Sequence, residues 1–303
     1  MRTSPAGLPA GDARKGAAVS DGVEQVTDPI AEHGEGPVWF PAWGGLVWVD
    51  MFAGDVLAVE PGSGRVRRRH VAGLVAAVRP RVGGGAVVAT ERGFLLVDAD
   101  GGRRDLGELW SDPGMRMNDG GCDPDGRFYC GTLAGGPLRG AGRLYRLDAE
   151  GRIEPVLEGV TVSNGLAWSP DGSTAYYVDS ATRRVDAFDY TRRDGLRRRR
   201  PFAEFPEEGG VPDGIAVDAE GGVWVALWGG GRVCRLSPSG RVEAVVELPV
   251  SRVSACAFGG PGLRDLYVTT SRLGLAPGTE PAAGALFRLR SGVAGLPVSA
   301  YAG

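Results

Sequence analysis

Oxygen-bearing side chains recur in this chain at a regular spacing, each beside a glycine or alanine and a short apolar stretch. They are Glu35, Asn118 (or Asp119, since the neighbouring glycines fit either), Asn164, Asp213 and Ser254. Carboxylate and amide oxygens suit Ca²⁺, Mg²⁺ and Mn²⁺, whereas zinc is less suited because no His or Cys shares this spacing. If these side chains met at one point, they would form a cage for a hard divalent cation.

Each of these residues also has a simpler interpretation. Asn-Gly and Asp-Gly are common turn dipeptides, so Asn164-Gly165 or Asp213-Gly214 alone predicts a turn more strongly than a ligand. Several acidic and amide residues at one shared spacing are harder to explain as turns. We therefore expect a metal site.

Other chemistries have less support. The chain has two histidines, His33 and His70, and no Gly-x-Ser-x-Gly segment, so a Ser-His-Asp triad is not expected. His33 precedes Glu35 by two residues, and we expect it near the same place, as a hydrogen-bonded loop residue in preference to a catalytic one. The glycines of 83–85 lie between strands instead of opening a helix, which argues against nucleotide binding.

A repeat supplies the elements that would bring the polar residues together. Each copy has an apolar strand, a Pro/Asp/Gly turn and a second apolar strand, usually followed by a third and a weaker fourth. The copies begin near residues 35, 76, 118, 164, 213 and 254. This pattern predicts an all-β fold, a six-bladed β-propeller with four antiparallel strands per blade. A β-sandwich or a β-helix fits the spacing less well.

In a propeller, the residue that begins each innermost strand lies at the mouth of the central channel. The polar residues of different blades should therefore converge, although they are far apart in sequence. The copy near Ala76 places only apolar residues at the shared position.

Composition limits the classes of fold and of partner that are expected for this chain. The chain has 303 residues, a net charge of −3, 51 Gly and 21 Pro, with 43% hydrophobic residues. So much glycine argues against a helical bundle, and the net charge gives no reason to expect a nucleic acid or an anionic membrane as partner. We expect a disordered tail over 1–24 and a single propeller domain over 25–303. The segment near Val23–Val26 should close the last blade.

Cysteines and arginines have plain interpretations. Cys122, Cys130, Cys234 and Cys256 show no CxxC spacing and predict buried free thiols in a reducing compartment. With no signal peptide recognised, we expect a cytoplasmic protein. The clusters Arg65–Arg69 and Arg197–Arg200 are expected to be solvated strand edges.

Several stretches together resemble the gluconolactonase/regucalcin family of senescence-marker-type sugar lactonases, over about residues 24–303. They are Gly34-Glu-Gly-Pro-Val-Trp39, Arg116-Met-Asn-Asp-Gly120, Ser163-Asn-Gly-Leu-Ala-Trp168, Pro212-Asp-Gly-Ile215, and the segments 258–269, 284–287 and 295–297. The resemblance implies metal-dependent hydrolysis of a lactone, a small-molecule substrate.

The resemblance also implies roles for single residues. Glu35, Asn164 and Asp213 match ligands of one divalent ion, Ca²⁺ first, with Mn²⁺, Mg²⁺ or Zn²⁺ as alternatives. Asp213 also matches the general base that takes a proton from water, while the metal polarises the carbonyl. Arg116 and Asn118 match substrate-binding positions.

One departure affects the substrate. Sugar lactonases of this family often carry a Glu in the stretch that is Gly131–Pro137 here, which has no acid. A less hydroxylated lactone is therefore an alternative, and Trp228 either lines its pocket or packs in the core. Two other functions stay open: a non-hydrolytic metal-dependent reaction of secondary metabolism, such as isomerisation or condensation, and a binding propeller without catalysis.

Overall fold

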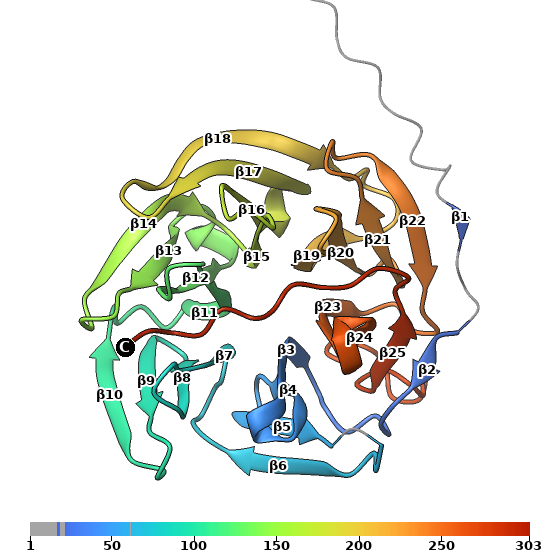
Figure 1. The fold of residues 1–303 in the computed structure, drawn as a ribbon, viewed down its shortest axis with the longest axis horizontal. Coiled ribbons are helices and arrows are strands. Elements are labelled where there is room, and N and C mark those ends of the chain that lie inside the picture. The colour runs from blue at the N-terminus through green and yellow to red at the C-terminus, as the bar shows by residue number, and fades with distance from the viewer. Residues whose placement is uncertain (1–16, 19–21, 61) are drawn as a thin grey trace, which may run out of the picture.

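The chain folds into six β-sheets set around one axis (Figure 1). The computed structural model describes residues 17–18, 22–60 and 62–303. Every sheet contains four antiparallel strands, from an innermost strand at the axis to an outermost strand at the rim. The predicted six-bladed, all-β propeller is confirmed.

Blades 1 to 3 follow one another along the chain. Blade 1 contains β3 (Gly34–Phe40), β4 (Gly45–Asp50), β5 (Asp55–Val59) and β6 (Val66–His70). Blade 2 contains β7 (Ala77–Pro80), β8 (Ala86–Ala89), β9 (Gly93–Val97) and β10 (Arg103–Glu108). Blade 3 contains β11 (Met115–Cys122), β12 (Phe128–Ala134), β13 (Gly142–Leu147) and β14 (Ile153–Val160).

Blades 4 to 6 complete the ring. Blade 4 contains β15 (Ser163–Trp168), β16 (Thr174–Asp179), β17 (Arg184–Thr191) and β18 (Gly195–Glu204). Blade 5 contains β19 (Val211–Val217), β20 (Val223–Trp228), β21 (Arg232–Leu236) and β22 (Val242–Glu247). Blade 6 contains β23 (Val253–Gly259), β24 (Asp265–Thr270) and β25 (Leu286–Arg290), with β2 (Glu24–Gln25) as its outermost strand.

The pairing of β2 with β25 closes the ring, as predicted for the segment near Val23–Val26. Most of the expected N-terminal tail, residues 1–16 and 19–21, lies outside the described residues. Between these parts, β1 (Ala17–Ala18) runs parallel to β22 at the rim of blade 5.

The hydrophobic core lies between the blades. Successive side chains of a strand point to opposite faces, and neighbouring blades cover both faces of each sheet. The strands near the axis are therefore apolar on both sides, and β4 and β8 are buried at every residue. This packing fixes the inner strands around the axis.

The outermost strands are exposed instead. Arg67–Arg69 on β6 and Arg197–Arg200 on β18 are exposed, so both arginine clusters are solvated strand edges, as predicted. Arg200 Nη1 donates to Asp189 Oδ1 of the neighbouring strand at 2.7 Å. All four cysteines are free and buried.

Helical structure in the described part of the chain is limited to short 3₁₀ turns. These are η1 (Pro41–Trp43), η2 (Gly136–Leu138), η3 (Ser180–Thr182) and η4 (Pro261–Leu263). None of the helices found there is long and apolar enough to span a membrane.

The C-terminal segment crosses the axis at the end of the channel where the inner strands finish (Figure 1). On one side Gly295 N–H donates to the Leu263 carbonyl at 2.7 Å. On the other, Tyr301 N–H donates to the Pro80 carbonyl at 2.7 Å. Between these anchors, residues 296–299 line an axial cavity of about 390 Å³ together with the ends of the inner strands.

Candidate functional site

Five inner strands are irregular where the predicted residues lie. In each, the register with the second strand shifts by one extra residue, which is a β-bulge. The shifts fall between Glu35 and Val38, Met117 and Gly120, Ser163 and Leu166, Pro212 and Ile215, and Val253 and Ala255. In blade 2, β7 pairs with β8 without any shift.

The bulge in β11 holds two consecutive polar residues. Asn118 and Asp119 lie between the paired residues Met117 and Gly120, and they are only 5% and 8% exposed. Neighbouring side chains of a regular strand would point to opposite faces. The sequence left open whether Asn118 or Asp119 occupies the shared position. The structure buries both residues in the bulge, so neither has to be excluded.

The glycines after Asn164 and Asp213 serve close packing. Asn164-Gly165 lies within β15 and Asp213-Gly214 within β19, so the turn interpretation is wrong for both dipeptides. A Cβ on Gly214 would lie 2.7 Å from the Cα of Ala255 in the next blade. Real Cβ atoms do not approach so closely, so only glycine lets these inner strands come together.

A chain of hydrogen bonds joins the predicted residues across three blades. Arg116 Nη1 donates to Asn118 Oδ1 at 2.7 Å, and Asn118 Nδ2 donates to Asn164 Oδ1 at 2.8 Å. Asn164 Nδ2 donates to Ser180 Oγ at 2.7 Å, and Ser180 Oγ donates to the Pro212 carbonyl at 2.6 Å. The chain ends one residue before Asp213, so it fixes the amide of Asn164 relative to that carboxylate.

Three buried carboxyl groups accompany this chain: Glu35, Asp119 and Asp213. Burial first, and the charge of Asp119 second, raise the pKa of Glu35 to about 8. Burial, Glu35 and Asp119 raise the pKa of Asp213 well above its usual value. Oδ1 of Asp213 is buried and has no hydrogen-bond partner among the described residues. The carboxyl groups therefore lack part of the positive charge that their ionised forms need.

Two arginines supply part of that charge. Arg116 and Arg79 both act to lower the pKa of Glu35, although the burial effect is larger. Arg79 comes from β7, and its Nη1 donates to the Gly36 carbonyl at 3.3 Å. The sequence did not single out Arg79, because its blade has no polar residue at the shared position.

His33 is near the site but does not add charge. Its Nε2 lies 3.9 Å from Glu35 Oε1, and its Nδ1 lies 2.8 Å from Ser271 Oγ. Burial, together with the charge of Arg116, lowers the pKa of His33 to about 3. This neutral, hydrogen-bonded ring agrees with the prediction of a loop histidine beside the channel.

The arrangement fits a hard divalent cation. Glu35, Asn164 and Asp213 offer oxygen atoms, and the unpartnered Asp213 oxygen is the kind of atom that an ion would satisfy. No three His, Cys, Asp or Glu side chains in the described ranges form a group able to hold a metal. An ion at this place would therefore need ligands besides these side chains, and the amide oxygen of Asn164 offers one.

Ser254 differs from the other residues of the series. Its Oγ donates to the Gly34 carbonyl at 2.6 Å and lies 3.0 Å from Thr269 Oγ1. The hydroxyl thus links blade 6 to blade 1, and it does not join the hydrogen-bond chain that holds Asn118 and Asn164.

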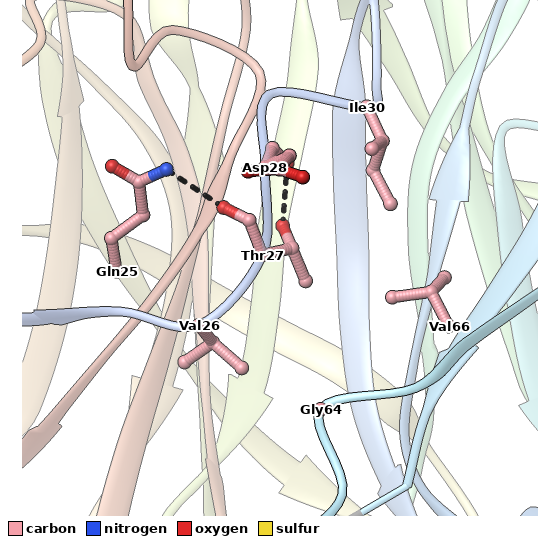
Figure 2. A pocket seen from close by; sticks show the side chains of 7 residues that line it. All are labelled: Gln25, Val26, Thr27, Asp28, Ile30, Gly64 and Val66. Carbon is pink, nitrogen blue, oxygen red and sulfur yellow. Dashed lines mark hydrogen bonds between the residues drawn. The ribbon is translucent and has the colours of Figure 1, made fainter.

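A second hollow of about 430 Å³ lies away from this site. Its walls are residues 25–28, Ile30, Gly64 and Val66, near the seam between blades 6 and 1 (Figure 2). Its polar groups already have partners: Gln25 Nε2 donates to the Thr27 carbonyl at 2.9 Å, and Thr27 Oγ1 accepts from the Leu286 N–H at 3.0 Å. The lining contains a single carboxylate, Asp28, so the hollow lacks the ligands of a metal site.

The sequence of this chain matches a known protein family. The family model described as "SMP-30/Gluconolactonase/LRE-like region" matches residues 33–272. Regucalcin of Sus scrofa is 38% identical over 294 residues, covering 93% of this chain and 98% of regucalcin. Pentonolactonase XacC of Haloferax volcanii is 35% identical over 284 residues, covering 91% of this chain and 96% of that protein.

Solved structures with the same fold include members of this family. The chain superposes on a luciferin-regenerating enzyme with a TM-score of 0.85 at 30% identity, covering 92% of this chain and 99% of that one. It superposes equally well, with a TM-score of 0.85 and 30% identity, on a calcium-binding protein, regucalcin, from Agrobacterium tumefaciens, covering 94% and 98% of the two chains. The protein therefore belongs to the SMP-30/gluconolactonase/LRE-like family.

Proposed function

We propose that this protein hydrolyses a lactone or similar small cyclic ester with one divalent cation, Ca²⁺ in the first place. The observation that supports this most is the buried group of Glu35, Asn164 and Asp213, in which one carboxylate oxygen lacks a partner among the described residues. Two relatives point the same way: one is named a pentonolactonase and one a calcium-binding regucalcin.

The ion, when bound, supplies positive charge where negative charge develops on the carbonyl oxygen of the attacked ester. Glu35, Asn164 and Asp213 would hold it. They lie on the inner strands of blades 1, 4 and 5, which the closed propeller sets around one axis.

Asp213 takes the proton from the attacking water in this proposal. Its raised pKa makes it a stronger base than an exposed aspartate, whereas contact with a cation would weaken it again. A carboxylate has two oxygens, so one can face the ion while the other accepts the proton.

Arg116 and Asn118 position the substrate. Arg116 uses Nη1 for Asn118 Oδ1 and for the Met117 carbonyl, which lies 2.9 Å away. Its other N–H groups remain for an acceptor on the substrate, presented in the rigid fork of a guanidinium.

The test is acid release from a panel of sugar and aromatic lactones at constant pH. The protein is first stripped with a chelator and then supplied with Ca²⁺, Mn²⁺, Mg²⁺ or Zn²⁺. We expect turnover only with metal. Isomerisation releases no acid, so metal binding without acid release from any lactone would overturn the proposal.

A variant tests the role of Asp213. Asp213→Ala should keep its fold, checked by circular dichroism and thermal melting, and lose most activity. Retention of more than about a tenth of kcat, equivalent to less than about 1.4 kcal/mol, would contradict the assignment of Asp213 as base.

A further inference from the structure

The axial cavity lies behind the candidate site, and the proposed reaction does not use it. Its walls come from the inner strands of all six blades and from residues 296–299, which cross over it (Figure 1). Glu35, Asn164 and Asp213 are not among its lining residues. Its volume of about 390 Å³ falls within the range of about 300–1,000 Å³ that is usual for small-molecule sites. The cavity is therefore large enough for a ligand of its own.

The inner strands leave apolar side chains uncovered at this cavity. Ala257 is the one residue of β23 that is not fully buried, and Leu166 and Ala167 are the two of β15. Ile215 and Ala216 of β19 are half-buried in the same way. All of them line the cavity, so their exposed surface faces its interior. An apolar ligand in the cavity would remove this surface from water.

Among the described residues that line the cavity, Arg79 of β7 is the only cation. Its Nη1 donates to the Val78 carbonyl at 2.8 Å and to the Gly36 carbonyl at 3.3 Å. Nε and Nη2 have no hydrogen-bond partner in the described part of the chain, and no carboxylate oxygen there lies within 4.0 Å of the guanidinium. The edge formed by Nε and Nη2, which can bind both oxygens of one carboxylate, is therefore free.

The lining also contains a carboxylate, Asp171, but the turn around Asp171 already occupies its oxygens. Asp171 Oδ1 accepts from Ser169 Oγ at 2.6 Å and from the Ser173 N–H at 3.0 Å. Its Oδ2 accepts from Ser173 Oγ at 2.8 Å. Asp171 is exposed in the hairpin between β15 and β16, whereas Arg79 is half-buried. The charge of Arg79 therefore lacks a paired anion on the cavity side.

The C-terminal segment offers an entry to the cavity. Val298 lines the cavity and is 40% exposed, so the cavity comes close to the surface there. The anchors of the segment lie on either side, at Gly295 and Tyr301, and no backbone hydrogen bond of the described structure ties residues 296–299 to the inner strands. A small movement of this span would admit a ligand and leave the anchors in place.

We propose that the axial cavity binds an aliphatic monocarboxylate of medium chain length. Its carboxylate would pair with the free edge of Arg79, and its hydrocarbon chain would lie against the half-buried residues of β15, β19 and β23. Each part of the ligand answers one part of the cavity. A small anion would leave the apolar walls in water, and a neutral hydrocarbon would leave the Arg79 edge without an acceptor. The site does not depend on the proposed lactone hydrolysis.

The first experiment is calorimetric titration of the full chain with octanoate, 1-octanol and acetate. It is made with Ca²⁺ and again in chelator, where no ion is left at the candidate site to attract a carboxylate. We expect one octanoate per chain in both conditions. Octanoate should bind at least about tenfold more tightly than 1-octanol, which lacks the charge, and than acetate, which lacks the apolar chain.

Two variants test where octanoate binds. Ala257→Leu adds bulk at the half-buried position of β23 and should weaken octanoate binding at least about tenfold. The control is Ala149→Leu, the same substitution at an exposed position in the turn after β13, which should bind octanoate as the wild type does. Arg79→Gln should bring the affinities for octanoate and 1-octanol together. Thermal melting checks that each variant is folded.

Each result bears on the proposal. Absence of octanoate binding would overturn it, and so would unchanged octanoate affinity in folded Ala257→Leu, because the ligand would then lie elsewhere. Equal affinities of the wild type for octanoate and acetate would remove the role of the apolar walls. A preference for octanoate over 1-octanol that persists in Arg79→Gln would remove the role of Arg79. Acid release from lactones is measured separately, so neither proposal falls with the other.

Discussion

Blade 2 and the other five blades differ in one backbone detail at the axis. The inner strand of blade 2 keeps a regular register with its neighbour, and its first residues, Ala77 and Val78, are buried and apolar. The other inner strands each carry a bulge, and four of these bulges hold or adjoin an acidic or amide residue. A regular strand is enough to build a blade, whereas the acidic and amide residues of the candidate site lie at bulges, which redirect side chains locally.

The most severe change should come from spoiling the close packing that the bulges require. Gly214→Ala places a Cβ 2.4 Å from the Cβ of Ala255, so the inner strands of blades 5 and 6 must separate. We expect a loss of about 1–3 kcal/mol in the free energy of unfolding, and weaker metal binding as Asp213 moves. Denaturant unfolding and calorimetric titration with Ca²⁺ measure the two effects.

Gly73→Ala is the control for this change. A Cβ on Gly73 has no heavy atom within 4 Å, so the same substitution should cost little there. Equal stability of the two variants would show that close approach at the bulge is unimportant.

A smaller effect is expected from Asp119, the second residue of the bulge in β11. Asp119→Asn removes one negative charge beside Glu35 and Asp213. Residues that support metal ligands typically contribute about 10–100-fold in metal affinity, so we expect Ca²⁺ binding to weaken by that order. Titration calorimetry measures it without reference to activity.

Asp28→Asn removes the same charge at an exposed position near the seam of the ring (Figure 2). Its Ca²⁺ affinity should match that of the wild type. If both variants bound Ca²⁺ as the wild type does, Asp119 would have no part in the site.

The metal-free protein should respond to pH through Glu35 and Asp213. Their pKa values are raised in the folded state, for Glu35 from 4.5 to about 8, so folding favours their protonated forms. The folded state then binds more protons than the unfolded state, and stability falls as pH rises from about 4.5 to 8. Melting temperatures in chelator should decrease over this range.

Bound metal should oppose this trend, because the ion binds the deprotonated groups. Glu35→Gln in chelator should show a flatter pH curve than the wild type. A melting temperature that rises with pH in the metal-free wild type would contradict the direction given for these two groups.

The smallest effect is expected at Ser180, which links Asn164 to the Pro212 carbonyl. Ser180→Ala should cost about 1 kcal/mol of stability and loosen the orientation of the Asn164 amide. Thr90→Ala in blade 2 removes a hydroxyl at a comparable place, after β8, where Oγ1 donates to the Gly93 carbonyl at 3.2 Å. Only Ser180→Ala should also lower Ca²⁺ affinity; equal affinities would remove Ser180 from the site.

The sequence predicted the architecture well because the repeat sets it. Six copies of an apolar strand pattern, with no long amphipathic helix to cover a sheet, indicate sheets packed against one another around an axis, so the number of blades followed from the pattern. The closing role of the segment near Val23–Val26 followed from the expected fold. The shared spacing also selected Asn118 and Asn164, which the structure joins by a direct hydrogen bond.

The bulges could not be predicted in the same way. A bulge depends on how two strands align, and the sequence of one strand does not contain that alignment. For this reason Asn164-Gly165 resembled a turn, and Asp119 could not be assigned beside Asn118. Arg79 escaped notice because it reaches the channel from a regular strand.

Closure of the ring also has a consequence for synthesis. Thr27 accepts a hydrogen bond from the N–H of Leu286, which lies 259 residues later in the chain. At about 5–20 residues per second, the ribosome takes roughly 13–50 s to make the partner of that early residue. During this interval blade 1 has been made but has no last blade to pack against. The nascent chain therefore depends on whatever shields its first blade until the final segment emerges.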